Sequence, residues 1–217
     1  MRVGIFGGAF NPPHKMHKEI AIELIEKNYL DKVIYVPTGN NYNKPGLLDG
    51  KDRINMLNLL VNEYNEKCKK IKDGKNIIEI SDFEVQGSLY TINTLKHCKE
   101  IYPNDEIYFI CGTDNLVEFN TWRDYEDILK NYKLLVIARK DNEFNDIIKM
   151  YLKYEKNIVL ANIEMQVISS TMVRKEILEN VYTEKLNQYL DEKIINYLKT
   201  INVSEVWNVD RKSKCEV

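Results

Sequence analysis

The chain of 217 residues lacks the features that mark several large classes of protein. No run of about eighteen apolar residues occurs, so the sequence holds no candidate membrane span. The formal net charge is only −2 and the pI is about 6.0, which argues against a protein that binds nucleic acids or membranes through bulk charge. With 44% apolar and 29% charged residues, the composition excludes a disordered or fibrous chain and is typical of a globular protein.

Cysteine is scarce as well, because Cys68, Cys98, Cys111 and Cys215 lie far apart and form no C-x-x-C pair. We therefore expect reduced thiols in a cytosolic protein rather than a disulfide framework. The first residues, MRVGIFGGAF, contain only a short apolar stretch before two glycines, which is typical of a strand and not of a signal peptide. A cytoplasmic location is the expectation.

Short apolar runs rich in β-branched and aromatic residues alternate with segments of helical spacing. Apolar strands of this kind need cover on both faces, and strands separated by helices run parallel. The predicted fold class is α/β, a doubly wound, mostly parallel sheet of about six strands with helices on both faces. The predicted strands are 2–6, 32–36, 77–80, 106–111, 133–138 and 157–160. The predicted helices are 17–27, 52–69, 91–101, 115–129, 143–154, 170–178 and 184–199.

No linker rich in proline, glycine or serine divides the chain, so we predict one domain over residues 1–200. Residues 201–217 are predicted to be a C-terminal tail. From Ser204 onward the sequence is polar and weakly periodic, and chain ends are loose unless they dock.

The turn after the first predicted strand carries the richest motif, GGAFNPPHKMH at residues 7–17. Its two glycines allow backbone amides to approach a ligand closely, and the helix that follows offers free N–H groups to an anion. His14 and His17 are three residues apart at this helix start and should share one face. We predict that both imidazoles donate hydrogen bonds to a bound phosphate.

Other readings of this turn are weaker. G-x-G-x-x-G and G-x-x-x-x-G-K-[ST] are both absent, so neither a dehydrogenase-type dinucleotide fold nor a P-loop is supported. A zinc site built on the histidine pair would need further ligands from His97, Cys98 or Cys111, which belong to distant segments. A plain capping or surface role for the two histidines is the other alternative.

A second candidate phosphate site, ISSTMVR at residues 168–174, precedes another predicted helix. Each hydroxyl alone would be an ordinary helix cap. Together, the three hydroxyls and the free amides of the first turn form a cradle for an anion. Arg174 lies one turn into the helix, where its guanidinium can reach phosphate oxygens.

The ordered pair of motifs resembles the nucleotidylyltransferase superfamily, and the segments between them are similar to the bacterial nicotinate-mononucleotide adenylyltransferases. The similar stretches are VPTG at 36–39 with Lys44 after it, YTINTL at 90–95, and FICGTDN at 109–115 followed by Trp122. The resemblance covers roughly residues 1–199. It implies a Rossmann-like enzyme that joins the AMP moiety of ATP to nicotinate mononucleotide, giving nicotinate adenine dinucleotide and pyrophosphate in NAD biosynthesis.

The resemblance also implies roles for individual residues. His14, His17, Lys44 and Arg174 would be the catalytic residues. The ATP-binding residues would be Gly7, Gly8, Ala9, Phe10, His14, His17, Gly112, Asp114, Ile168, Ser169, Ser170, Thr171 and Arg174. Nicotinate mononucleotide would contact Phe10, Asn40, Lys44, Tyr90, Thr91 and Trp122. We expect no metal held by the protein itself, since Mg²⁺ would enter with ATP and be bound mainly by phosphate.

The chain departs from the family pattern at Met16, where glycine is usual, at Asn11, where aspartate is also common, and at Leu89, which separates Ser88 from Tyr90. Nicotinamide mononucleotide or phosphopantetheine as the acceptor, or a regulator that binds nucleotide without catalysis, remain as alternatives. Small-molecule substrates are the expected partners, with no nucleic acid and no membrane. A homo-oligomer is left open.

Overall fold

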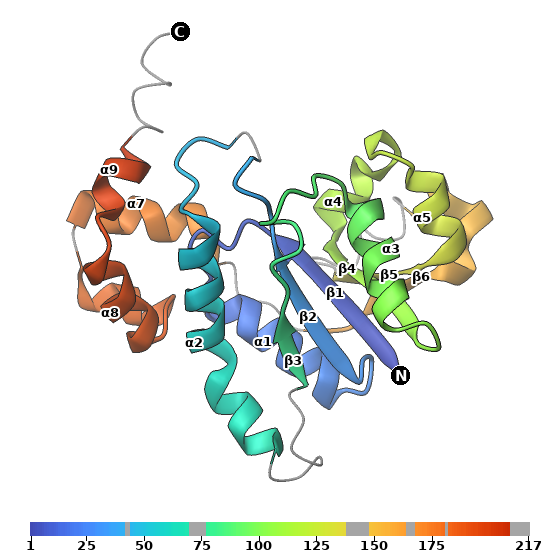
Figure 1. Ribbon diagram of the computed structural model, residues 1–217, viewed down its shortest axis with the longest axis horizontal. Coiled ribbons are helices and arrows are strands. Elements are labelled where there is room, and N and C mark those ends of the chain that lie inside the picture. Colours follow the sequence, from blue (N-terminus) through green and yellow to red (C-terminus); the bar gives the residue numbers. More distant parts are fainter. Residues whose placement is uncertain (42–43, 70–76, 138–147, 164–167, 181, 209–217) are drawn as a thin grey trace, which may run out of the picture.

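The structure is a computed structural model that describes residues 1–41, 44–69, 77–137, 148–163, 168–180 and 182–208 (Figure 1). Its six strands form one sheet in the order β3-β2-β1-β4-β5-β6, and every neighbouring pair is parallel. The strands are β1 Arg2–Gly8, β2 Lys32–Pro37, β3 Ile78–Ile80, β4 Glu106–Gly112, β5 Lys133–Ile137 and β6 Ile158–Ala161. This arrangement confirms the predicted α/β class, with the strand order reversing between β1 and β4.

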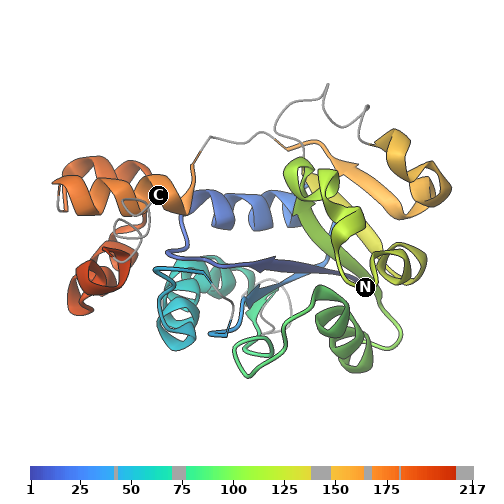
Figure 2. The ribbon, with the colours of Figure 1, turned by 90° about the horizontal axis from the view of Figure 1, so that it is seen from above.

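Helices cover both faces of the sheet. The α-helices are α1 Lys15–Glu26, α2 Gly50–Lys69, α3 Thr91–Ile101, α4 Thr113–Val117, α5 Tyr125–Asn131, α7 Ser170–Asn180, α8 Glu192–Thr200 and α9 Val203–Trp207. The 3-10 segments are η1 Phe119–Thr121, η2 Ile148–Asn157 and η3 Glu184–Gln188. α1 and α3 lie on opposite sides of β1 (Figure 2). No helix in the described ranges has the length and apolar character needed to cross a membrane.

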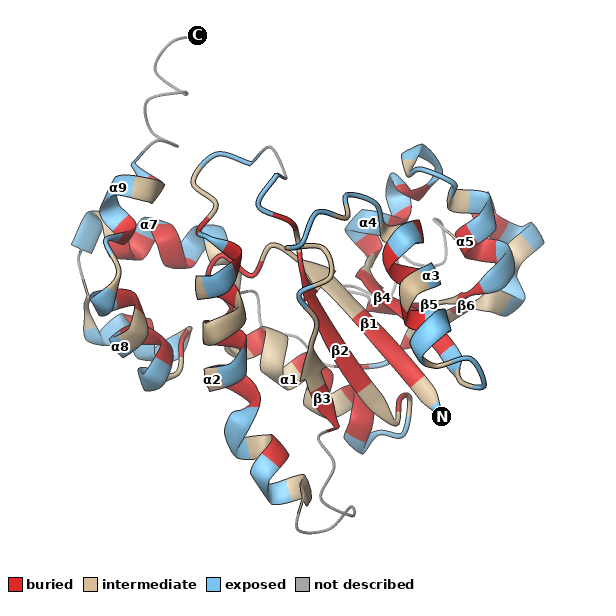
Figure 3. Cartoon of the chain, in the orientation of Figure 1, coloured by how far each residue is buried: buried red, intermediate tan, exposed pale blue. Residues whose placement is uncertain are grey.

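Two apolar clusters explain why the sheet is buried on both faces. Side chains that alternate along β2 divide between them, since Val33 and Tyr35 join the cluster of α1, α2, α7 and α8, whereas Ile34 and Val36 join that of α3 and α5. Figure 3 shows the same pattern, with the central strands largely buried. The continuous apolar runs in the sequence are thus the consequence of cover on both sides.

Three of the predicted helices differ from the structure. Residues 115–129 are not one helix but α4, η1 and α5, because Trp122 has an extended backbone (ψ 145°) and Asp124 is left-handed (φ 53°). The predicted helix 184–199 divides into η3 and α8 at the extended cap residue Asp191. In the predicted helix 143–154, residues 143–147 lie outside the described part, and the remainder belongs to η2, which is interrupted at Tyr151.

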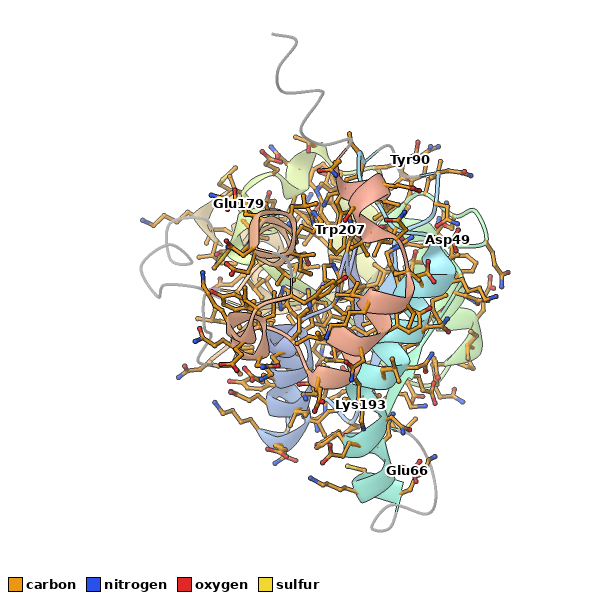
Figure 4. The ribbon with its side chains drawn as sticks, turned by 90° about the vertical axis from the view of Figure 1, so that its left-hand side faces the viewer. Asp49, Glu66, Tyr90, Glu179, Lys193 and Trp207 are labelled. Atoms are coloured by element: carbon orange, nitrogen blue, oxygen red, sulfur yellow. The ribbon has the colours of Figure 1, made fainter. Side chains whose placement is uncertain are left out.

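The predicted loose tail also differs from the structure. Residues 203–207 form α9, and both Val203 and Trp207 are buried. Trp207, labelled in Figure 4, is fully enclosed in the apolar cluster that also contains α7 and α8. The buried side chain of Trp207 thus anchors residues 203–207 to the core, although the polar composition of this segment predicts a loose chain end. Residues 209–217 lie outside the described part.

Candidate active site

A cavity of about 480 Å³ opens at the carboxyl ends of β1 and β2, beside the point where the strand order reverses. Gly7, Gly8, Thr38 and Gly39 form part of its wall. Ligands of open α/β sheets bind at this kind of edge. The turn after the first strand therefore lies where the sequence analysis expects a ligand.

The two histidines of the first motif lie together at the start of α1. Their rings stack with centroids 3.7 Å apart, and the backbone N–H of His14 donates to Nδ1 of His17 over 3.0 Å. Because Nδ1 of His17 accepts this bond, the neutral ring carries its proton on Nε2. His17 is thus prepared to donate a hydrogen bond from the nitrogen that the loop does not use.

Burial keeps both imidazoles neutral at pH 7. Desolvation lowers the pKa of His14 to about 4, and the side chain is only 5% exposed. The pKa of His17 also lies well below its usual value, chiefly through desolvation and secondly through the neighbouring His14. Phe10 adds to this environment, because its ring is buried against that of His17 at 4.9 Å. At pH 7 each ring is therefore neutral and has one N–H group that can donate a hydrogen bond to a phosphate oxygen.

The lowered pKa of His14 predicts how stability depends on pH. Between pH 4 and about 6.5 the unfolded chain binds more protons than the folded one, so the free energy of unfolding rises with pH across this window. At about 1.4 kcal/mol per unit of pKa, His14 alone contributes on the order of 3 kcal/mol above the window. Urea unfolding of the wild type and His14→Gln at pH 4.5 and 7 should give a smaller pH dependence for the variant. Equal pH dependence in both would contradict this assignment.

The second motif docks onto the first, although 158 residues separate Ser170 from Pro12. Ser170 Oγ donates to the Pro12 carbonyl over 2.8 Å, and Arg174 Nη1 donates to the Asn11 carbonyl over 2.8 Å. Ser169 Oγ accepts from the N–H of Met172, as a helix cap does. The N-terminus of α7 is therefore attached to the loop that leads into α1.

Besides its predicted role in phosphate binding, Arg174 makes structural hydrogen bonds. The side chain is 9% exposed, and Nη2 donates to Thr171 Oγ1 over 3.2 Å. Its guanidinium thus holds the loop before α1 and the first turn of α7 in one arrangement. Ile168, which begins the motif, is half-buried and packs at the edge of the apolar cluster. A phosphate role for these residues remains a prediction.

Four of the predicted acceptor residues line the cavity, namely Lys44, Tyr90, Thr91 and Trp122. The indole of Trp122 is half-buried and packs against the rings of Phe109 at 5.7 Å and Phe119 at 4.9 Å. Trp122 lies in the bend between η1 and α5, and this bend exists because residues 115–129 do not form one continuous helix. Tyr90 lies just before α3 and is exposed at the upper edge of the molecule (Figure 4).

Two predicted acceptor residues have structural contacts instead, and neither borders the cavity in the described part. The Phe10 ring packs beneath His17. Asn40 is occupied within its own loop, because Oδ1 accepts from the N–H of Gly50 over 2.7 Å and Nδ2 donates to Asp49 over 3.0 Å. As for the histidine pair and the second motif, which do not line the cavity either, contact with a nucleotide stays a prediction.

The end of β4 supplies the remaining predicted ATP residues. Gly112 precedes α4, and a Cβ at this position would lie 2.2 Å from Asp114 Oδ1, so a larger residue would displace that exposed carboxylate. Asp114 is exposed in the first turn of α4, where an acidic side chain suits the helix dipole. This position is compatible with both the capping role and the predicted contact with nucleotide. Ala9 follows β1 and lines the cavity with Gly7 and Gly8.

One residue that the sequence analysis missed connects the loops around the cavity. Arg53 in α2 is fully buried, and its guanidinium donates to the carbonyls of Leu48 at 2.8 Å, Ala9 at 3.1 Å and Thr38 at 2.8 Å. A fourth bond reaches Asn40 Oδ1 at 3.1 Å. Desolvation lowers the pKa of Arg53, which the charge of Asp49 partly opposes. Ala9 and Thr38 both line the cavity, so Arg53 fixes its walls from behind.

Asn11 acts in the same way from the other side. It is 1% exposed, its Nδ2 donates to the Gly46 carbonyl over 2.7 Å, and its Oδ1 accepts from the N–H of Leu48 over 3.0 Å. In the sequence, Asn11 stands out only as a departure from the family pattern. Its carboxamide in fact joins the first motif to the loop between β2 and α2, which carries Lys44.

Comparison with known proteins agrees with this architecture. A family model described as cytidylyltransferase-like matches residues 5–176. A curated protein of Clostridium tetani is 30% identical over 203 residues, which cover 90% of this chain and 94% of the relative. A protein of Clostridium acetobutylicum is 34% identical over 203 residues, with the same coverage. Both carry the name "Probable nicotinate-nucleotide adenylyltransferase".

Among solved structures, the nicotinic acid mononucleotide adenylyltransferase of Plasmodium falciparum complexed with NaAD aligns with a TM-score of 0.77 at 23% identity, over 94% of this chain and 98% of that one. The same enzyme complexed with APC gives a TM-score of 0.75 at 22% identity, with the same coverage. At these identities the likeness establishes the fold. The sequence matches establish more than the fold. They show that this chain belongs to the cytidylyltransferase-like family and, within it, to the nicotinate-nucleotide adenylyltransferases.

Proposed function

We propose that this chain transfers the adenylyl group of ATP to nicotinate mononucleotide, which yields nicotinate adenine dinucleotide and pyrophosphate. One observation carries the proposal beyond family membership. The helix N-termini of α1 and α7 are joined through Pro12 and Asn11, in the loop that follows Ala9, and Ala9 lines the same cavity as Thr91 and Trp122. Two anion-binding helix ends beside a pocket with an aromatic wall suit a polyphosphate and a second, ring-bearing phosphate ester.

The ATP side of the reaction needs positioning and charge stabilisation rather than an enzyme nucleophile. A phosphate oxygen of the acceptor attacks the α-phosphorus of ATP, and the bond to the bridging oxygen of pyrophosphate breaks. His14 and His17 would donate hydrogen bonds to the oxygens on which charge increases during this step. The hydroxyls of Ser169, Ser170 and Thr171 with the first amides of α7 would hold the β- and γ-phosphates.

The acceptor side would use the cavity. The indole of Trp122 offers a face for a pyridine ring, and the N-terminus of α3 near Thr91 offers backbone N–H groups to a carboxylate. Lys44 is exposed at the mouth, where its ammonium group would neutralise part of the polyphosphate charge. These contacts hold both reactants in line, which is the main source of rate in such a transfer.

Magnesium would arrive with ATP. The described residues contain no group of three or more His, Cys, Asp or Glu side chains close enough together to hold a metal ion. Mg²⁺ retains much of its hydration and is commonly bound through substrate phosphates. We therefore propose that ATP and water hold the cation. The cation would offset the negative charge of the phosphates, while the protein groups named above orient them.

The test is pyrophosphate release from ATP and Mg²⁺ with three acceptors side by side, nicotinate mononucleotide, nicotinamide mononucleotide and phosphopantetheine. We expect kcat/KM to be highest for nicotinate mononucleotide, by about tenfold or more over nicotinamide mononucleotide, because a full charge distinguishes the acid from the amide. A preference for either of the other acceptors would overturn the proposed substrate. ATP binding without pyrophosphate release from any of them would favour a regulator, and Met16→Gly would then be the variant to examine.

A further inference from the structure

The cavity is lined by two cationic side chains and one carboxylate, and one of the two cations, Arg123, has no role in the family motifs. Three charged side chains line it, namely Lys44, Glu84 and Arg123. Glu84 is half-buried, and its Oε1 accepts from Thr94 Oγ1 over 2.6 Å, so its carboxylate is engaged with the wall. The two cations are exposed at the mouth. An anionic ligand is therefore favoured over a neutral one of the same shape.

Arg123 occupies a distinctive place at this mouth. It directly follows Trp122 in the bend between η1 and α5, and its guanidinium carbon lies 4.5 Å from the ring centroid of Tyr90, across the cavity entrance on the segment before α3. Both side chains are exposed. The only acidic contact recorded for Arg123 in the described part is Asp124 Oδ2 at 3.9 Å, which is too long for a hydrogen bond. The guanidinium thus rests on an aromatic face.

We propose that the Arg123 side chain selects an acidic pyridine mononucleotide over the corresponding amide. The inference rests on the proposed function and adds a residue to it. A ring stacked on Trp122 would place its substituent within reach of the next residue along the chain. Arg123 can leave Tyr90 at small cost, since an exposed cation–π contact contributes only about 0.5–1 kcal/mol. It can then pair with a carboxylate through two N–H groups, whereas a carboxamide offers one neutral acceptor.

The other cation would not discriminate in this way. Lys44 belongs to the loop after β2, on the side of the cavity formed by Thr38 and Gly39. Its compact ammonium group suits a phosphate, which both the acid and the amide carry. Loss of Lys44 should therefore weaken both acceptors, and loss of Arg123 should weaken the acid alone.

The experiment compares wild type, Arg123→Gln, Arg123→Lys and Lys96→Gln. Lys96 is exposed on α3 and does not line the cavity, so its variant controls for the loss of one surface charge. Two readouts are needed for nicotinate and nicotinamide mononucleotide, the dissociation constant by calorimetry and kcat/KM by pyrophosphate release. For Arg123→Gln we expect about a tenfold loss with the acid, less than a twofold change with the amide, and partial recovery in Arg123→Lys.

The outcomes distinguish the proposed role of Arg123 from the proposed adenylyl transfer. A fall in the acid-to-amide ratio of dissociation constants in Arg123→Gln, but not in Lys96→Gln, supports the inference. Equal losses for both acceptors, or none for either, overturn it, because Arg123 would then serve general packing or nothing at the site. Wild-type protein that binds the acid selectively but releases no pyrophosphate would overturn the proposed function and leave the selectivity of Arg123 standing.

Discussion

In His17→Ala, we expect the turnover number to fall by about a hundred- to a thousandfold, while the dissociation constant for ATP changes by less than about threefold. The reason lies in the orientation of the ring. Nδ1 of His17 accepts the N–H of His14, which leaves the proton on Nε2 as the group available to a ligand. A donor placed on a phosphate oxygen contributes most when charge increases there, so its loss should affect the transition state more than the ground state.

Two conservative variants divide the role of His17 into its parts. In His17→Gln the side-chain amide can donate near the position of Nε2, whereas in His17→Asn the shorter side chain can replace only the acceptor at Nδ1. We expect His17→Gln to retain more turnover than His17→Asn if the donor to phosphate is the important group. His97→Ala is the matched control, because that ring stacks on Phe83 at 4.0 Å, outside the described site, and should leave turnover within about twofold.

Steady-state pyrophosphate release and equilibrium binding of ATP together decide this prediction. Equal losses in turnover and in affinity would mean that His17 only binds the ground state. Retention of full turnover in His17→Asn, with loss in His17→Gln, would mean that the essential function of the ring is to hold the loop before α1 through the N–H of His14.

The architecture was predictable because its determinants are local. Six apolar runs separated by helical segments give the strand count, and the need to cover both faces gives the parallel direction. The structure confirms both. The errors occurred where one residue changes the backbone path. Asp124 in the left-handed region and extended Trp122 end a helix whose apolar spacing continues through them, and spacing alone carries no signal for such a break.

The site was predictable to the extent that motifs describe it. The two turns for which anion binding is predicted lie together, and Trp122, Thr91, Tyr90 and Lys44 share one cavity. The residues that hold this arrangement were not predictable from motifs, since Arg53 and Asn11 act on backbone carbonyls and amides, which every sequence contains. A signal for Arg53 does exist. It occupies the apolar face of α2 with Met56, Leu57 and Leu60, so a buried charge could have been expected at that position.

Removal of the buried charge of Arg53 is expected to have a large effect on stability. In Arg53→Met, which retains an aliphatic stem but removes the guanidinium, we expect the free energy of unfolding to fall by about 3–5 kcal/mol. Four oxygen acceptors on Ala9, Thr38, Leu48 and Asn40 lose their donor in a place that water does not reach freely. Arg2→Met is the control, because Arg2 and its partner Asp31 are only half-buried, and ion pairs near the surface contribute about 1 kcal/mol or less.

Arg53→Met also separates structural support from positioning. If Arg53 only stabilises the fold, activity measured well below the melting temperature should equal that of the wild type. Because Ala9 and Thr38 line the cavity, we expect instead that KM for the acceptor rises by about tenfold or more with a smaller change in the turnover number. Arg53→Lys keeps the charge but can satisfy fewer acceptors, so it should fall between the two in both stability and KM. Stability within about 1 kcal/mol of the wild type and an unchanged KM would contradict the view that one buried guanidinium sets the spacing of the cavity walls.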